Sequence, residues 1–195
     1  MKKRYLFLVI LLSCFIVGCS GEKEEGAAYI TTNEDSEYTR TFNELDIGML
    51  HDFHLKLTQA DKSWVTIWVE GYRNGEKTEP FHLAEFSIGL SPNKVEKGHL
   101  GLGIINSTSE DASLFIYALG SKANSDNLKN ILSTDYKWNY ATGKEKIELE
   151  FGQTKIIGAY RQVEKSYISS YDFEDPDAVE QMIKEVTPFF CLRLK

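Results

Sequence analysis

The chain has 195 residues, of which 42% are hydrophobic, and a formal net charge of −7 at neutral pH. This length is enough for one domain with a substantial core and short for two. The 29 acidic side chains outnumber the 22 basic ones. Phosphate backbones and anionic lipid surfaces are therefore repelled, and we expect neither nucleic acid nor direct docking of the domain on a membrane face.

The first eighteen residues have the layout of an export signal. Lys2, Lys3 and Arg4 precede an apolar run over residues 5–17. A helix needs ~20 apolar residues to cross a bilayer, and this run is shorter. The layout therefore predicts a signal peptide that is removed after export, and the remaining chain is more acidic by the three charges that leave with it.

The signal ends in Ile16-Val17-Gly18-Cys19. This tetrapeptide resembles the lipobox of bacterial lipoproteins. The resemblance implies a diacylglyceryl group on the Cys19 sulfur, cleavage after Gly18, and a mature chain that begins at the lipidated cysteine. The expected location is the extracytoplasmic face of the cell membrane, with the membrane as a partner through this lipid.

The cysteines leave no pair for a disulfide in the mature domain. Cys14 lies in the signal and Cys19 carries the expected lipid, so Cys191 remains alone. It lies in an apolar stretch, where a free cysteine usually behaves as a small buried hydrophobe. The domain must therefore be held together by its apolar core.

We expect residues 19–44 to be a lipidated N-terminus followed by a flexible polar tether, and residues 45–195 to be a single β-rich domain. The composition of residues 20–44 is too polar to offset the entropy of ordering. A flexible chain of ~25 residues spans roughly 25 to 30 Å, so the domain would stand off the bilayer.

The hydrophobic pattern along the domain has a period of two. It predicts strands over residues 51–57, 63–72, 79–90, 99–105, 113–119, 146–151, 154–160 and 189–194, and the pattern is weaker over residues 136–140 and 167–173. Asn74-Gly75 predicts a hairpin turn, and Gly152-Gln153 predicts a second one between residues 146–151 and 154–160. Residues 91–98 read as a short helical turn, and residues 121–130 read as a loop.

One helix is predicted near the end of the chain. Asp175 is its expected cap, Pro176 its first residue and Pro188 its end. About eight or nine short strands and this single helix before a terminal strand indicate a mainly β protein, an antiparallel sandwich or barrel.

The motif search favours no catalytic site, no cofactor and no metal site. Ser91-Pro92-Asn93-Lys94 with Ser125-Asp126-Asn127 resembles two signatures of penicillin-binding proteins and serine β-lactamases, but no Lys-Thr-Gly follows. His51 and His54 should point to opposite faces of a strand. The acidic residues around Asp175 are better explained as a helix cap than as a calcium loop.

Aromatic residues remain as candidates for binding. About two thirds of them should fill the core, and five are candidates for a contact surface: Trp64, Trp68, Tyr136, Trp138 and Tyr140.

The leading hypothesis is a lipid-anchored, non-catalytic binding or interaction module for a protein, a peptide or an envelope polymer. An alternative is a small-ligand carrier, because a barrel followed by a helix and a strand loosely resembles the lipocalin order of elements, although the G-x-W signature of that family is missing. A second alternative is an enzyme of unrecognised type.

Overall fold

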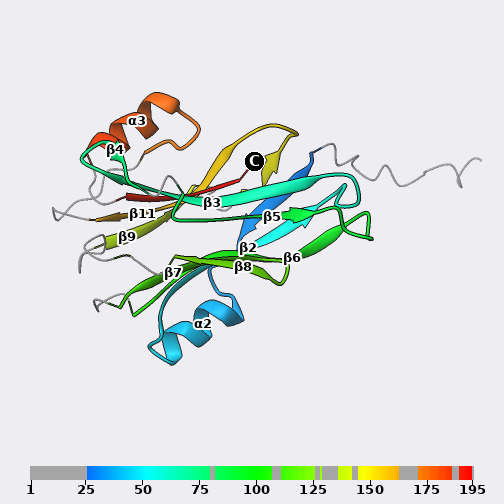
Figure 1. Ribbon diagram of the computed structural model, residues 1–195, viewed down its shortest axis with the longest axis horizontal. Coiled ribbons are helices and arrows are strands. Elements are labelled where there is room, and N and C mark those ends of the chain that lie inside the picture. The colour runs from blue at the N-terminus through cyan, green and yellow to red at the C-terminus, as the bar shows by residue number, and fades with distance from the viewer. Residues whose placement is uncertain are drawn as a thin grey trace, which may run out of the picture.

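A computed structural model gives the fold of residues 26–79, 82–106, 111–125, 128, 136–141, 145–162, 171–185 and 189–194, with the side chains of Tyr136, Gln162 and 189–194 outside the description. These residues form two antiparallel six-stranded sheets that pack face to face (Figure 1). Helix α2 (Glu37–Glu44) lies against the outer face of one sheet, and helix α3 (Pro176–Glu185) lies against the other.

The first sheet, sheet A, has the strand order β10-β1-β2-β6-β7-β8. Its bounds are β10 (Ile147–Leu149), β1 (Ala28–Thr32), β2 (Gly48–Leu57), β6 (Glu96–Ile105), β7 (Ser113–Ala118) and β8 (Ser121–Ser125). The second, sheet B, has the order β4-β3-β12-β11-β9, and β5 also pairs with β3. Its bounds are β4 (Glu76–Lys77), β3 (Trp64–Arg73), β12 (Phe189–Leu194), β11 (Lys155–Gln162), β9 (Tyr136–Tyr140) and β5 (Ala84–Gly89).

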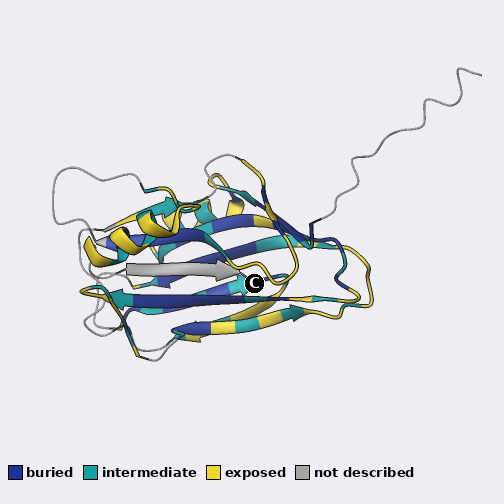
Figure 2. Cartoon of the chain, turned by 90° about the horizontal axis from the view of Figure 1, so that it is seen from above, coloured by how far each residue is buried: buried dark blue, intermediate teal, exposed yellow. Residues whose placement is uncertain are grey.

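The core lies between the two sheets because alternate residues of each strand are apolar. Along β2, Phe53, Leu55 and Leu57 are buried, and β3 contributes Val65, Ile67 and Val69. Figure 2 shows the alternation of buried and exposed segments along the outer strands. Each such side chain contributes about 1.5 to 3 kcal/mol when it leaves water. This burial is the main source of stability that the described residues show.

The mainly β, antiparallel architecture predicted from the sequence is confirmed, and it is a sandwich. The described strands form two separate sheets and do not close into a barrel. The lipocalin-like barrel is therefore excluded for these strands.

The Asn74-Gly75 turn is also confirmed. Both residues have positive φ, 53° and 82°, which is the conformation that a two-residue hairpin turn requires.

The expected tether is wrong from residue 26 onward. Strand β1 lies inside sheet A between β2 and β10, and Ile30 in its middle has no exposed surface. Helix α2 follows, capped by Ser36, whose Oγ accepts a hydrogen bond from Thr39 N at 3.0 Å. The alternation of Tyr29 and Ile30 was too short to outweigh the polar residues around it, so the globular part begins before residue 45.

Four further local expectations fail. Residues 91–98, expected as a short helical turn, are not helical, and the last three of them belong to β6. Residues 147–149 and 155–162 do not form a hairpin, because β10 pairs with β1 in sheet A while β11 pairs with β9 and β12 in sheet B. Residues 121–125, expected as a loop, are the edge strand β8. Tyr171–Phe173 is not a strand, and the rest of that expected strand lies outside the described residues.

Candidate functional site

The register of sheet A brings polar side chains together on its outer face. Asp52 and His54 of β2 alternate with the buried residues of that strand, and the strand pairing sets His54 directly opposite His99 of β6. In the next row, Asp52 is opposite Gly101, which is in turn opposite Tyr117 of β7. Residues that are distant in sequence therefore meet on one surface.

Asp52 is the centre of this cluster. Its side chain is wholly buried and accepts hydrogen bonds from Asn33 Nδ2 at 2.7 Å, from His99 Nδ1 at 2.8 Å and from Tyr117 Oη at 2.7 Å. A buried carboxylate is costly unless donors surround it. These three donors satisfy Asp52 and at the same time fix the positions of the His99 and Tyr117 side chains.

The environment keeps Tyr117 protonated. Burial raises the pKa of its hydroxyl well above the usual range, and the hydrogen bond to Asp52 and its negative charge raise it further. Tyr117 therefore remains a hydrogen-bond donor to Asp52 at every pH at which the protein works.

His99 is held in a fixed orientation at the surface. Its Nδ1 is used by Asp52, and the ring of Tyr38 lies over it with centroids 4.4 Å apart. Among the described residues, His99 hydrogen-bonds to the Asp52 carboxylate and not to a hydroxyl or thiol that could act as a nucleophile. The arrangement leaves Nε2 of an oriented imidazole for a hydrogen bond to a ligand.

An aromatic groove adjoins this cluster. It encloses about 490 Å³ between α2 and sheet A. We call it the α2 groove; it is lined by Glu37, Tyr38, Thr41 and Phe42 of the helix and by Leu50, Phe115 and Tyr117 of the sheet.

Two glycines of β6 create room for the floor of the α2 groove. A Cβ at position 103 would lie 2.2 Å from Phe115 Cζ, and a Cβ at position 101 would lie 2.4 Å from Tyr117 Oη. The rings of Phe115 and Tyr117 can therefore lie across β6 only because these positions have no side chain. Glycine at these two positions of β6 thus permits a close approach of neighbouring side chains.

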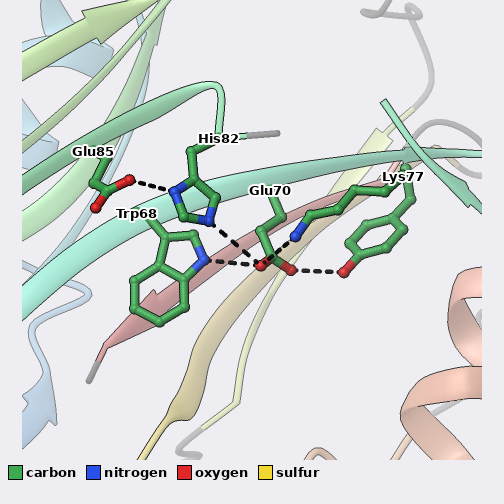
Figure 3. Close-up of polar contacts among 6 residues, drawn as sticks. Trp68, Glu70, Lys77, His82 and Glu85 are labelled. Carbon is green, nitrogen blue, oxygen red and sulfur yellow. Dashed lines mark hydrogen bonds and ion pairs between the residues drawn. The ribbon is translucent and has the colours of Figure 1, made fainter. Parts of the chain in front are cut away.

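A second polar cluster lies on the outer face of sheet B (Figure 3). Glu70 is buried and accepts hydrogen bonds from Trp68 Nε1 at 2.9 Å, Tyr72 Oη at 2.6 Å and Lys77 Nζ at 2.7 Å. His82 Nε2 lies 3.9 Å from the same carboxylate, and its other ring nitrogen contacts Glu85. The carboxylate is saturated with donors, so the cluster ties β3 to β4 and has no free acceptor for a ligand.

The five aromatic residues expected as a contact surface do not lie together. Trp64 is exposed, whereas Trp68 is buried over Glu70 on the outer face of sheet B. Trp138 and Tyr140 pack inward against the core. The side chain of Tyr136 lies outside the described residues, although its backbone is in β9.

The inward position of Trp138 brings it into contact with His51, and both side chains are half-buried. The two rings are stacked at 4.2 Å with an interplanar angle of 6°. His51 Nε2 and Trp138 Nε1 are buried without a hydrogen-bond partner among the described residues. Burial lowers the pKa of His51 to about 3, so the imidazole is neutral in the folded protein.

The other motifs have local structural roles. Ser91 Oγ contacts Glu96 and accepts from Asn93 N at 3.1 Å, which closes a turn before β6. Asp175 Oδ1 accepts from Asp177 N at 3.0 Å at the start of α3, as expected for a cap. His51 and His54 point to opposite faces, and no group of three potential metal ligands occurs among the described residues.

Asp52, Tyr117 and α2 were not predicted from the sequence as parts of a site. Asp52 had a signal: a lone carboxylate in the middle of an apolar strand must find donors. The helix had one as well, because Ser36 precedes Tyr38 and Phe42 at helical spacing.

Comparison with known proteins adds no relative. The sequence matches no protein-family model, and neither a curated protein nor a solved structure is significantly similar to it. Within the described residues, neither helix has the length and apolar character needed to cross a bilayer.

Proposed function

We propose that this protein is an extracytoplasmic lipoprotein, anchored in the cell membrane by a lipid on Cys19, whose domain is a non-catalytic binding module. The signal layout and the tetrapeptide that ends at Cys19 support the anchor. We further propose that the α2 groove is the binding surface for a segment of a protein, a peptide or an envelope polymer.

The single observation that carries the binding proposal is the composition of the α2 groove. Rigid aromatic rings from α2 and β7 give it apolar contact area. His99 does not line the groove, but its oriented imidazole lies against the ring of Tyr38, which does. Ligand sites in proteins usually combine such an apolar surface with a few polar groups in fixed positions. The Glu70 cluster lacks this combination, because its acceptors are already used.

The groove proposal can be tested by photocrosslinking in the native envelope. A photoreactive amino acid at Thr41, which lines the groove, should crosslink to a partner. The matched control is Arg40, the preceding exposed residue of the same helix, which does not line it. Equal crosslinking from both positions, or none from Thr41, would contradict the proposal.

A second variant tests the groove without a probe. Gly103→Ala places a Cβ 2.2 Å from the tip of the Phe115 ring and should push that ring into the groove. We expect loss of the Thr41 crosslink with the domain still folded, as judged by circular dichroism. Retention of the crosslink in a folded Gly103→Ala variant would argue against this surface.

The anchor is tested separately. In Cys19→Ser, mass spectrometry should no longer detect the added mass of the lipid, and the domain should be released from the membrane fraction. A Cys19→Ser variant that remains lipidated would refute the anchor.

A further inference from the structure

One end of the sandwich carries four exposed apolar side chains. Trp64 begins β3, Leu90 follows β5, Val95 precedes β6 and Phe151 follows β10. Their exposed fractions are 63%, 63%, 41% and 59%. The other large exposed apolar residues of the described chain, Tyr38 and Leu45, belong to α2 and the turn after it.

Strand pairing and a shared pocket place these residues at the same end, which we call the Trp64 end. Trp64 is opposite Gly89, and Leu90 N donates to Ser63 O at 3.0 Å. Trp64 and Phe151 line one small pocket together with Ala27, the residue before β1. The chain therefore enters the fold at the Trp64 end.

A basic hollow of about 290 Å³ lies beside this end, on the outer face of sheet A. Three lysines line it, Lys56, Lys97 and Lys146, and none of its described lining residues is a carboxylate. Lys56 and Lys97 are directly opposite each other in the β2–β6 register. Like charges in directly opposite positions are destabilising, and a bound anion reduces their repulsion.

The position of β1 fixes how far the Trp64 end can be from the expected lipid. Gly26 is the seventh residue after Cys19, and Tyr29 Oη accepts a hydrogen bond from Gly26 N at 3.1 Å. A fully extended chain of seven residues spans at most about 25 Å. With the lipid on Cys19 in the bilayer, the Trp64 end lies within about 25 Å of that residue, which puts the headgroups within its reach.

We propose that the Trp64 end is a membrane-contact surface, on which Trp64 and Phe151 enter the interfacial region while Lys97 and Lys146 contact the phosphates of anionic lipids. This inference rests on the proposed anchor. Tryptophan prefers the membrane interface because its ring is apolar and its N–H is polar. Glu150 lines the same small pocket as Trp64 and Phe151 and opposes this contact. Carboxylates more than about 8 Å from the lipid phosphates are screened at physiological salt.

The lipidated protein in vesicles provides the test. Brominated lipids quench a tryptophan that reaches the acyl chains, so fluorescence in phosphatidylglycerol vesicles should be quenched for the native protein. Trp64→Phe should remove this quenching, because Trp68 is buried and Trp138 packs against the core. Absence of quenching in the native protein, or equal quenching in Trp64→Phe, would overturn the proposal.

Charge variants test the lysines. A lysine near an anionic surface contributes a factor of about five to binding. The double variant Lys97→Gln/Lys146→Gln should therefore lower the ratio of protein with Trp64 in the membrane to protein with Trp64 in water about 25-fold. The control is Lys184→Gln, next to the Asn74-Gly75 turn at the opposite end of β3, which should leave the ratio unchanged.

The outcomes separate the two proposals. If the mature chain carries no lipid on Cys19, both the anchor and the membrane contact fall. If it is lipidated but Trp64 is not quenched, or the lysine variants behave like Lys184→Gln, the anchor stands and the membrane contact falls. Quenching by neutral and anionic vesicles alike would refute the role of the lysines. Trp64 crosslinked to a protein in the envelope while unquenched by lipid would assign this end to a protein partner instead.

Discussion

Lowering the pH from 7 to 5 should destabilise the native protein more than its His51→Phe variant. His51 is stacked on Trp138 between the sheets, and burial lowers its pKa from 6.5 to about 3. The unfolded chain binds a proton at this histidine as the pH falls below 6.5, whereas the folded protein does not bind it until about pH 3. Stability is therefore lost on acidification across this window.

The size of the effect follows from the two pKa values. Between pH 7 and pH 5, protonation of His51 in the unfolded state alone lowers the free energy of unfolding by about 2 kcal/mol. Phenylalanine keeps a ring against Trp138 and removes both the titration and the unpartnered Nε2. The variant should be at least as stable as the native protein at pH 7, and its advantage should grow by about 2 kcal/mol at pH 5.

Urea unfolding followed by tryptophan fluorescence at both pH values measures this difference. The other histidines and the carboxylates are present in both proteins, so their contributions cancel in the comparison. The neighbouring Tyr140, whose pKa is raised to about 12, stays neutral throughout. If the native protein and His51→Phe lose the same stability between pH 7 and pH 5, the neutral buried histidine is refuted.

Replacing Asp52 with asparagine should lower the free energy of unfolding in urea by about 2 to 3 kcal/mol, because an amide cannot accept hydrogen bonds from all three donors. The same substitution should lower the pKa of Tyr117, which the ultraviolet absorbance of tyrosinate reports. An unchanged titration of Tyr117 would contradict its contact with Asp52. Glu70→Gln should lower the free energy of unfolding by about 2 kcal/mol because it removes the carboxylate that pairs with Lys77 Nζ. A Glu70→Gln variant as stable as the native protein at both low and high salt would count against this ion pair. Gly158→Ala should cost about 1 to 3 kcal/mol, since the new Cβ would lie 2.1 Å from Trp138 Cζ2; a thermal midpoint equal to that of the native protein would show that the ring does not cover this glycine.

Local patterns in the sequence were sufficient where a strand or turn is determined by its own residues. The alternation in β2 and β3, the Asn74-Gly75 turn and the capped helix α3 were all predicted with correct faces or positions. In each case the residues that decide the conformation lie within a few positions of one another.

The pairing of one strand with another could not be predicted from local sequence in the same way. Gly152 has the positive φ, 76°, of a reversal, yet the chain crosses from sheet A to sheet B there instead of pairing with itself. Edge strand β8 has too few apolar residues to be distinguished from a loop. Strand β1 is short, and its burial depends on neighbours at β2 and β10 rather than on its own sequence.

The candidate site could be predicted even less well, because its residues come from strands that are distant in sequence. Asp52 bonds to His99 and Tyr117 across separations of 47 and 65 residues. Only the register of β2, β6 and β7 brings them together, and a single sequence contains no signal for register between distant strands. The aromatic residues were selected by type, so buried rings such as Trp138 could not be separated from an exposed one such as Trp64.

Strand β12 has a consequence for the order of folding. It lies in the middle of sheet B, paired on one side with β3 and on the other with β11. Any nascent chain that has not yet reached residue 189 therefore presents two open strand edges where the finished sheet has none, and such edges readily pair with other chains. Sheet B is complete only when residues 189–194 are in place, because β12 joins β3 to β11. Deleting this strand should therefore separate the two halves of the sheet and abolish it.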